Sequence, residues 1–225
     1  MLGEVFRLFF PKLCVACNCN LLKNESFVCT HCLLHLPQTH FHKSPDNALQ
    51  KVFWGRLNIE SALAFVYFKK GGAMQHVLHE IKYKNNTELA LFLGNYYGSI
   101  LKFGSSNFNA VAAIPLHKNK QRARGYNQSA LIAEGIASQL GVEHISHELV
   151  RFIATETQTR KSRFERWENV ETVFGLKNVT AFENKHVLLI DDVITTGATI
   201  EACGNAILKA PGVKLSIGAI AFTSN

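Results

Sequence analysis

The chain has 225 residues, of which 47% are hydrophobic and 18% are charged, so it is long enough for one ordinary domain with a small appendage and too apolar for global disorder. Its formal net charge of +7 favours anionic partners such as phosphates or nucleic acid without choosing among them. No uncharged apolar run of about eighteen residues or more occurs, so we predict no membrane insertion.

The first segment, Met1–Leu13, is apolar but carries Glu4, Arg7 and Lys12. Its uninterrupted apolar run, Leu8–Pro11, is too short for a signal-peptide core. We expect a short amphipathic helix here rather than a membrane anchor, in a cytoplasmic protein. In that reducing compartment, cysteines are more typical of metal ligands or buried thiols than of disulfides.

Two Cys-x-x-Cys pairs follow, and eleven residues separate them. Each pair places two thiolates on one tight turn, and two such turns complete the tetrahedral shell that zinc prefers. Because four protein ligands leave no position for water, the pattern predicts a structural zinc site. The predicted ligands are Cys14, Cys17, Cys29 and Cys32. Removing the zinc should unfold residues 10–36 and spare the rest of the chain.

Alternatives to this ligand set stay open. Cys19 could replace one of the four cysteines, as could a nearby histidine. The histidines concerned are His31, His35, His40 and His42. Free buried thiols or a redox dithiol are the alternatives to a metal, although a redox motif normally needs only one pair.

The composition divides the chain into a zinc-binding module at 1–45, a linker at 46–57 and an α/β domain at 58–225. Apolar periodicity and β-branched content predict strands and helices in alternation across the third part. The predicted strands are 62–68, 110–114, 148–153, 187–190 and 213–222, and the predicted helices are 74–84, 88–103, 127–140 and 197–209. Residues 154–180 are polar and predict a long loop. This alternation indicates a mostly parallel sheet flanked by helices.

The most informative stretch runs from Val187 to Thr199. An apolar strand ends at Asp191 and Asp192, and a hydroxyl-rich turn then opens a helix. In a parallel sheet this strand end faces the ligand crevice. Backbone N–H groups and hydroxyls of the turn suit a phosphate, and the two carboxylates suit the vicinal hydroxyls of a sugar, directly or through a divalent cation. The predicted phosphate ligands are Thr195, Thr196, Gly197, Ala198 and Thr199.

Other interpretations of this stretch are weaker. Neither a GxxxxGK[ST] loop nor a GxGxxG turn after a strand occurs in the chain. The plain structural alternative is that the acid pair only caps the following helix, but a cap does not require two carboxylates before Thr-Thr-Gly-Ala-Thr.

A basic segment follows the predicted strand 110–114. Its cations, Lys118, Lys120, Arg122 and Arg124, fall within seven residues and suit a pyrophosphate. A solvated basic turn is the alternative. The polar loop carries Gln158, Arg166 and Asn169, and in a transferase it would be a lid that excludes water. A disordered surface loop is the alternative there, and His117 could carry a proton or simply be solvated.

The thirteen residues from Val187 to Thr199 resemble the phosphoribosyl pyrophosphate motif of type I phosphoribosyltransferases. With Lys82-Tyr-Lys84, the segment Ile114–Gln128, Gln158, Arg166-x-x-Asn169 and the cysteine module, they resemble the ComF family over nearly the full length. The resemblance implies the type I phosphoribosyltransferase fold, a zinc-finger N-terminus, a pyrophosphate loop at the basic segment and, in some members, a role in DNA uptake. The extra Cys19 departs from the pattern.

Three functions follow as hypotheses. The first is a phosphoribosyltransferase that binds phosphoribosyl pyrophosphate with Mg²⁺, uses Asp191 and Asp192 at the ribose, and transfers the group to a nitrogen nucleophile with release of pyrophosphate. The second is a non-catalytic competence factor that binds single-stranded DNA or the uptake machinery. The third is a ligand-sensing regulator. A homodimer also stays open.

Overall fold

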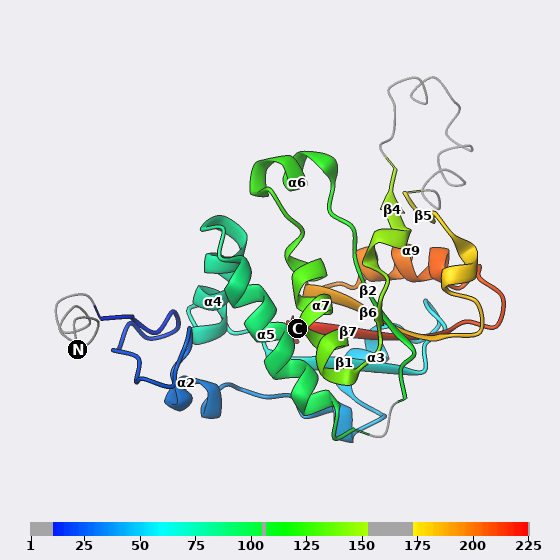
Figure 1. The fold of residues 1–225 in the computed structure, drawn as a ribbon. Coiled ribbons are helices and arrows are strands. Elements are labelled where there is room, and N and C mark those ends of the chain that lie inside the picture. Colours follow the sequence, from blue (N-terminus) through cyan, green and yellow to red (C-terminus); the bar gives the residue numbers. More distant parts are fainter. Residues whose placement is uncertain (1–10, 105–106, 153–172, 225) are drawn as a thin grey trace.

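The centre of the protein is a five-stranded, fully parallel sheet (Figure 1). The structure is a computed structural model that describes residues 11–104, 107–152 and 173–224. The strand order is β1-β7-β6-β2-β3. The bounds are β1 Ser61–Tyr67, β2 Ala110–Ala113, β3 Glu143–His144, β6 His186–Ile194 and β7 Lys214–Phe222. The predicted α/β class with a parallel sheet is therefore confirmed.

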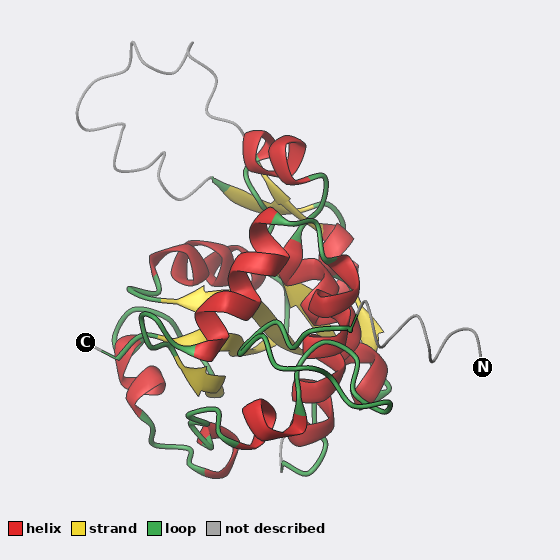
Figure 2. Ribbon diagram, turned by 90° about the vertical axis from the view of Figure 1, so that its left-hand side faces the viewer, coloured by secondary structure: helices red, strands yellow, loops and turns green. Residues whose placement is uncertain are grey.

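Alternating apolar side chains fill a core on each face of the sheet. In β6, Leu188 and Ile190 join one buried cluster, and Val187 and Leu189 join the other. Helices α4 (Ala73–Tyr83), α5 (Thr87–Leu101) and α7 (Gln128–Leu140) cover the first face, and α3 (Ala48–Val52) and α9 (Ala198–Ile207) cover the second. Figure 2 shows helices on both sides of the sheet. Burial on both faces explains why the strands are continuously apolar.

Helices α5 and α7 touch backbone to backbone. A Cβ added at Gly94 would lie 2.3 Å from the carbonyl oxygen of Ile132, and one at Gly135 would lie 2.6 Å from that of Leu91. Glycine is therefore required at both positions for the helices to approach this closely. The contact positions α7 against α5, and the first residues of α7 reach the candidate site.

The cysteine module packs on the first face instead of standing apart. Its short helix α2 (Thr30–Leu34) begins at Cys29, and Val28 belongs to the same buried cluster as α4 and α5. The rings of Phe27 and Phe92 lie 5.5 Å apart. Farther along, a 3-10 turn (η1) spans Phe41–Lys43.

Residues 46–57, predicted as a linker, contain helix α3. Asn47 caps this helix by accepting a hydrogen bond from the backbone N–H of Gln50. Leu49 and Phe53 are fully buried in the second core. The stretch is too short and too polar for a helical pattern to stand out, so its packing was not predictable from composition.

Four further local differences from the sequence-based expectations concern the edge of the sheet that carries the candidate site. Strand β6 continues through both carboxylates to Ile194, because its pairing with β7 extends to Phe222. The basic segment is not a loop but helix α6 (Lys118–Arg124), which is capped by His117 and Gly125. The predicted strand at 148–153 lies outside the main sheet: β4 (Leu149–Arg151) pairs antiparallel with β5 (Phe174–Leu176). Strand β5 itself falls inside the predicted loop 154–180, together with a 3-10 turn (η5) at Val179–Ala181.

A second 3-10 turn (η2), Ser146–Glu148, connects β3 to β4. Helix α6 and the β4–β5 pair both rise above the sheet in Figure 1. Within 11–104, 107–152 and 173–224, no helix combines the length and the apolar character needed to cross a bilayer.

Candidate functional site

A small cavity lies where β6 passes into α9. It has a volume of about 40 Å³ and is lined by Asp191 and by the continuous stretch 193–200, so it contains all five predicted phosphate ligands. Gly197 precedes α9, with a φ of 75°, and no side chain caps this helix end. The first N–H groups of a helix have no partner inside it. The start of α9 can therefore donate to an anion in the cavity.

Neither carboxylate of the acid pair caps α9. The interpretation of the pair as a helix cap is therefore wrong. Both side chains instead make contacts with the start of α7, on the neighbouring side of the crevice.

Asp192 is buried in a polar network, with 6% of the residue exposed. Its Oδ2 accepts a hydrogen bond of 2.8 Å from Nε2 of Gln128 and lies 3.0 Å from Nζ of Lys82, which comes from α4. A buried carboxylate needs such partners, because removing its charge from water is costly. Asp192 thus has a cation and a donor before any ligand binds.

Asp191 is held more loosely and opens onto the cavity. Its Oδ1 accepts from Oγ of Ser129 at 3.2 Å and from the backbone N–H of Asp192 at 2.9 Å. Burial, followed by the adjacent Asp192 charge, raises the pKa of Asp191 to about 7. A carboxyl group with a pKa near neutrality at a cavity wall is typical of a functional site.

The turn Thr195–Thr199, called the phosphate turn below, has a backbone supported by residues that the sequence analysis did not identify. A Cβ at Gly197 would lie 2.6 Å from the ring of Phe53, so glycine is required there both by φ and by space. The Arg56 guanidinium donates to the carbonyl oxygen of Thr196 at 3.0 Å and forms an ion pair with Glu201 of α9 at 2.5 Å. Arg56 therefore ties the predicted linker to the turn and to the first part of α9.

The four cations predicted to bind pyrophosphate differ in their contacts and in their exposure. Arg124 donates to Oε1 of Gln128 at 2.9 Å and sits 5.6 Å from the ring centroid of Tyr83. Through Gln128 it belongs to the same hydrogen-bonded chain as Asp192. Lys118, Lys120 and Arg122 are exposed on α6 and have no ion pair within the part of the chain that the structure describes. The predicted lid residues Gln158, Arg166 and Asn169 lie outside the described residues.

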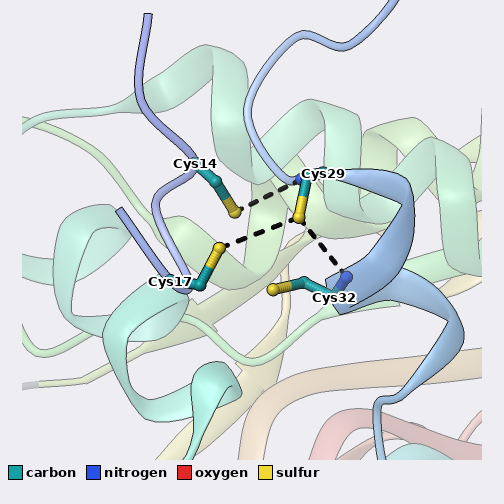
Figure 3. Close-up of side chains that lie close together, drawn as sticks. All are labelled: Cys14, Cys17, Cys29 and Cys32. Atoms are coloured by element: carbon teal, nitrogen blue, oxygen red, sulfur yellow. Dashed lines mark hydrogen bonds between the residues drawn. The ribbon is translucent and has the colours of Figure 1, made fainter. Parts of the chain in front are cut away.

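The four predicted zinc ligands come together in one cluster (Figure 3). Their sulfur atoms all lie within 4.8 Å of one another, and the side chains point toward a common centre. Cys19 is exposed and takes no part in this cluster, although its carbonyl oxygen accepts from the backbone N–H of Cys14. None of the described histidines joins the cluster.

The geometry of this cluster fits zinc. Sγ of Cys17 lies 3.8 Å from Sγ of Cys29, close to the roughly 3.8 Å between sulfurs around a tetrahedral zinc with bonds of about 2.3 Å. Backbone N–H groups of Cys29 and Cys32 donate to Sγ of Cys14 and Cys29. Burial would raise the pKa of the Cys14 thiol, but backbone hydrogen bonds, led by that from Cys29, outweigh it and lower the pKa to about 7. Burial, by contrast, raises the pKa of the Cys32 thiol, so the thiolate form that zinc binds is favoured at Cys14 but not at Cys32.

Comparison with known proteins finds similar sequences and structures. Residues 127–225 match the sequence model described as "Phosphoribosyl transferase domain". The "DNA utilization protein YhgH" of Escherichia coli (strain K12) is 26% identical, over 88% of this chain and 84% of the relative. The "Competence protein ComFC" of Bacillus subtilis (strain 168) is 27% identical, over 88% of this chain and 78% of the relative. The chain is therefore similar to the YhgH and ComFC proteins over most of its length, and its residues 127–225 match a phosphoribosyl transferase domain.

A solved structure of the glutamine phosphoribosylpyrophosphate amidotransferase from B. subtilis, complexed with ADP and GMP, shares 17% identity with this chain. The match has a TM-score of 0.44 and covers 58% of this chain. It spans only 26% of the amidotransferase.

Proposed function

We propose that the protein binds phosphoribosyl pyrophosphate at the cavity between β6 and α9 and transfers its phosphoribosyl group to a nitrogen nucleophile. The turn Thr195–Thr199 would hold the 5-phosphate, and the acid pair would hold the ribose hydroxyls. Asp191 would hold Mg²⁺, and the ion would neutralise charge on the leaving group. Asp191 suits this role because its carboxylate opens onto the cavity, whereas Asp192 already has Lys82 as a partner.

In the proposed reaction, the nitrogen lone pair of the acceptor forms a bond to C1 of the ribose while the bond from C1 to the pyrophosphate oxygen breaks. The electrons of that bond leave with pyrophosphate, and the proton on the nitrogen passes to solvent. Positive charge builds up on the sugar in the transition state, and the nearby carboxylates would stabilise it. Lys118, Lys120, Arg122 and Arg124 would attract the leaving pyrophosphate.

The observation that carries the proposal is the uncapped start of α9 in a cavity that also contains Asp191. A helix end without a side-chain cap leaves several N–H groups for a ligand, and the cavity is of a size for one phosphate group. The match of residues 127–225 to the phosphoribosyl transferase domain supports the same interpretation.

Calorimetric titration with phosphoribosyl pyrophosphate, with and without Mg²⁺, tests the proposal. Binding should require Mg²⁺, and the double variant Asp191→Asn, Asp192→Asn should weaken it by roughly 2–4 kcal/mol, since charge-assisted hydrogen bonds contribute about 1.5–3 kcal/mol each without adding fully. Asp46→Asn, at an exposed carboxylate paired only with Lys51, is the matched control. Equal affinity in wild type and double variant would contradict the proposal.

Release of pyrophosphate with a panel of candidate bases then separates enzyme from sensor. Turnover with any base supports the transferase. Tight binding without turnover would instead support a ligand-sensing regulator with the same site.

Single-stranded DNA binding is the second candidate function, because the relatives carry the names "Competence protein ComFC" and "DNA utilization protein YhgH". The exposed cations of α6 would supply the contacts to nucleic-acid phosphates. Since the same cations are proposed for pyrophosphate, phosphoribosyl pyrophosphate should weaken DNA binding, and the converse must hold.

Fluorescence anisotropy across a salt series tests the DNA candidate. Replacing Lys118, Lys120, Arg122 and Arg124 by alanine should remove both activities, whereas the Asp191/Asp192 double variant should lose only the sugar-phosphate one. Weak binding that disappears at physiological salt would argue against DNA as a partner.

We further propose that residues 1–45 form the zinc module and residues 58–225 the phosphoribosyltransferase domain. The four-cysteine cluster supports the first part, and the parallel sheet, all of whose strands fall within 58–225, supports the second.

A further inference from the structure

A second, larger cavity lies beside the candidate site. Its volume is about 400 Å³, within the usual range for small-molecule sites. It is lined by residues that follow β2, by Asn127 and Ala130 at the start of α7, and by Lys177 just after β5. The remaining lining residues are His144, Ser146, His147, Leu149, Val150 and Arg151. None of the functions discussed so far uses most of these side chains.

The cavity is close to the acid pair because β2 and β6 are neighbouring parallel strands. The backbone N–H of Ile114 donates to the carbonyl oxygen of Ile190 at 3.0 Å. Ile114 directly precedes Pro115 in the cavity wall, and Ile190 directly precedes Asp191. Adjacent strands lie about 4.8 Å apart, so the two cavities share one edge of the sheet.

The charged residues of the lining are all basic. Lys118, Arg151 and Lys177 come from three different segments, and no Asp or Glu lines the cavity. None of these three cations has a carboxylate partner among residues 11–104, 107–152 and 173–224. Cations that line one space without a counter-charge favour an anionic ligand.

The remaining lining indicates what else the ligand needs. Pro115, Leu116, Leu149 and Val150 give the cavity apolar walls. A bare phosphate or pyrophosphate would gain nothing from such walls, whereas a ring compound would bury its faces against them. Ser146 has a hydroxyl already engaged with Nε2 of His144 at 2.6 Å, so it orients that imidazole at the cavity wall.

We infer that this cavity receives the acceptor of the transfer reaction, and that the acceptor is a nitrogen heterocycle that carries a carboxylate. The inference rests on the proposed function, which supplies the transfer reaction in which the acceptor takes part. The heterocycle lies against the apolar walls, and its carboxylate meets Arg151 and Lys177. Its ring nitrogen supplies the lone pair that forms the bond to C1 as pyrophosphate leaves with the electrons of the broken bond.

Matched pairs of probes test the inference in the full-length chain. Nicotinate and nicotinamide, and orotate and uracil, differ chiefly in the carboxylate. We expect each acid to bind about tenfold or more tightly than its neutral partner, the range of one charge-assisted hydrogen bond. The double variant Arg151→Gln, Lys177→Gln should bind both members of a pair equally and keep the wild-type affinity for phosphoribosyl pyrophosphate.

Controls separate this inference from the function on which it rests. Lys209→Gln changes an exposed lysine beyond α9 and should keep the preference for acids. Lys177→Gln alone changes an exposed side chain and serves if the double variant fails to fold. If the wild type binds acids selectively but not phosphoribosyl pyrophosphate, the proposed function fails while the anionic site stands.

Three results would overturn the inference. One is that no acid of the panel binds to the wild type, and another is that acid and neutral partner bind equally. The third is that the double variant keeps the preference, or loses affinity for phosphoribosyl pyrophosphate as much as for the acids, since the cavity would then belong to the pyrophosphate.

Discussion

Asp191 and Asp192 are neighbours in sequence but differ in what surrounds them. Asp192 has a cation and an amide donor, whereas Asp191 has a hydroxyl, one backbone N–H and the charge of Asp192 beside it. Asp191, the carboxylate without a cation as its direct partner, lines the cavity, and burial followed by the Asp192 charge raises its pKa. A ligand that brings cationic charge should therefore drive Asp191 to release its proton.

This difference predicts a pH dependence of stability in the absence of ligand. The folded pKa of Asp191, about 7, lies above the ordinary value of 3.8, so the folded state binds more protons between these pH values. Its contribution to stability is then complete below about pH 4 and is lost as the pH rises through about 7. Asp191→Asn should remove this loss and stabilise the protein at pH 8 by about 1–3 kcal/mol. Urea titrations at pH 5 and pH 8 measure it, and an identical pH profile in variant and wild type would contradict the assignment.

At the scale of elements, the brace formed by Arg56 is the feature that most affects the phosphate turn. Arg56→Ala removes the hydrogen bond to Thr196 and the ion pair with Glu201. We expect binding of phosphoribosyl pyrophosphate to weaken by about 1–2 kcal/mol, because the turn loses a donor that fixes its backbone. A double-mutant cycle with Glu201→Gln measures how much of this loss in binding free energy depends on the ion pair. Lys51→Ala, in helix α3, is the control, and an unchanged affinity in Arg56→Ala would show that the brace serves stability alone.

The regular elements were predictable because their side chains repeat. Strand β1 was predicted at 62–68 and spans Ser61–Tyr67, and α7 was predicted at 127–140 and spans Gln128–Leu140. Helix α6 escaped prediction because it buries no residue, so its sequence has no apolar period. The short strands β3 and β5 have two and three residues, too few for any pattern.

The candidate site was predictable in its local part only. A strand, an acid pair and a hydroxyl-rich turn are continuous in sequence, so their chemistry can be read there. The partners of the acid pair, Lys82 and Gln128, and the brace from Arg56 are brought in by folding from distant positions. No local pattern marks such contacts.

At the scale of the whole molecule, the cysteine module is coupled to the α/β domain by a shared core. The sequence alone predicted that removing zinc would unfold residues 10–36 and spare the rest. In the structure, Phe27 packs on Phe92 of α5, and His76 of α4 lies 3.3 Å from the carbonyl oxygen of Ala16. Loss of the module would expose the apolar faces of both helices to water.

We therefore expect chelation of zinc to increase hydrogen exchange in α4 and α5 as well as in the module. Because Lys82 of α4 pairs with Asp192, affinity for phosphoribosyl pyrophosphate should fall at the same time. Hydrogen-exchange mass spectrometry before and after chelation measures the first effect, and calorimetry measures the second. If the increase in exchange is confined to the module, the expectation that zinc removal spares the rest of the chain is correct. If elemental analysis finds no metal in protein purified without chelator, the zinc site itself is contradicted.

The strand order also determines when the sheet can be completed during synthesis. Strand β7 lies between β1 and β6, and its pairing joins Ser61 to Ser216. Until Lys214–Phe222 has left the ribosome, β1 has no neighbour in the sheet, and β6 lacks one of its two. A nascent chain therefore carries two open strand edges, which are prone to wrong pairing. The phosphate turn, although encoded in one stretch, gains its final support only after translation has passed beyond it.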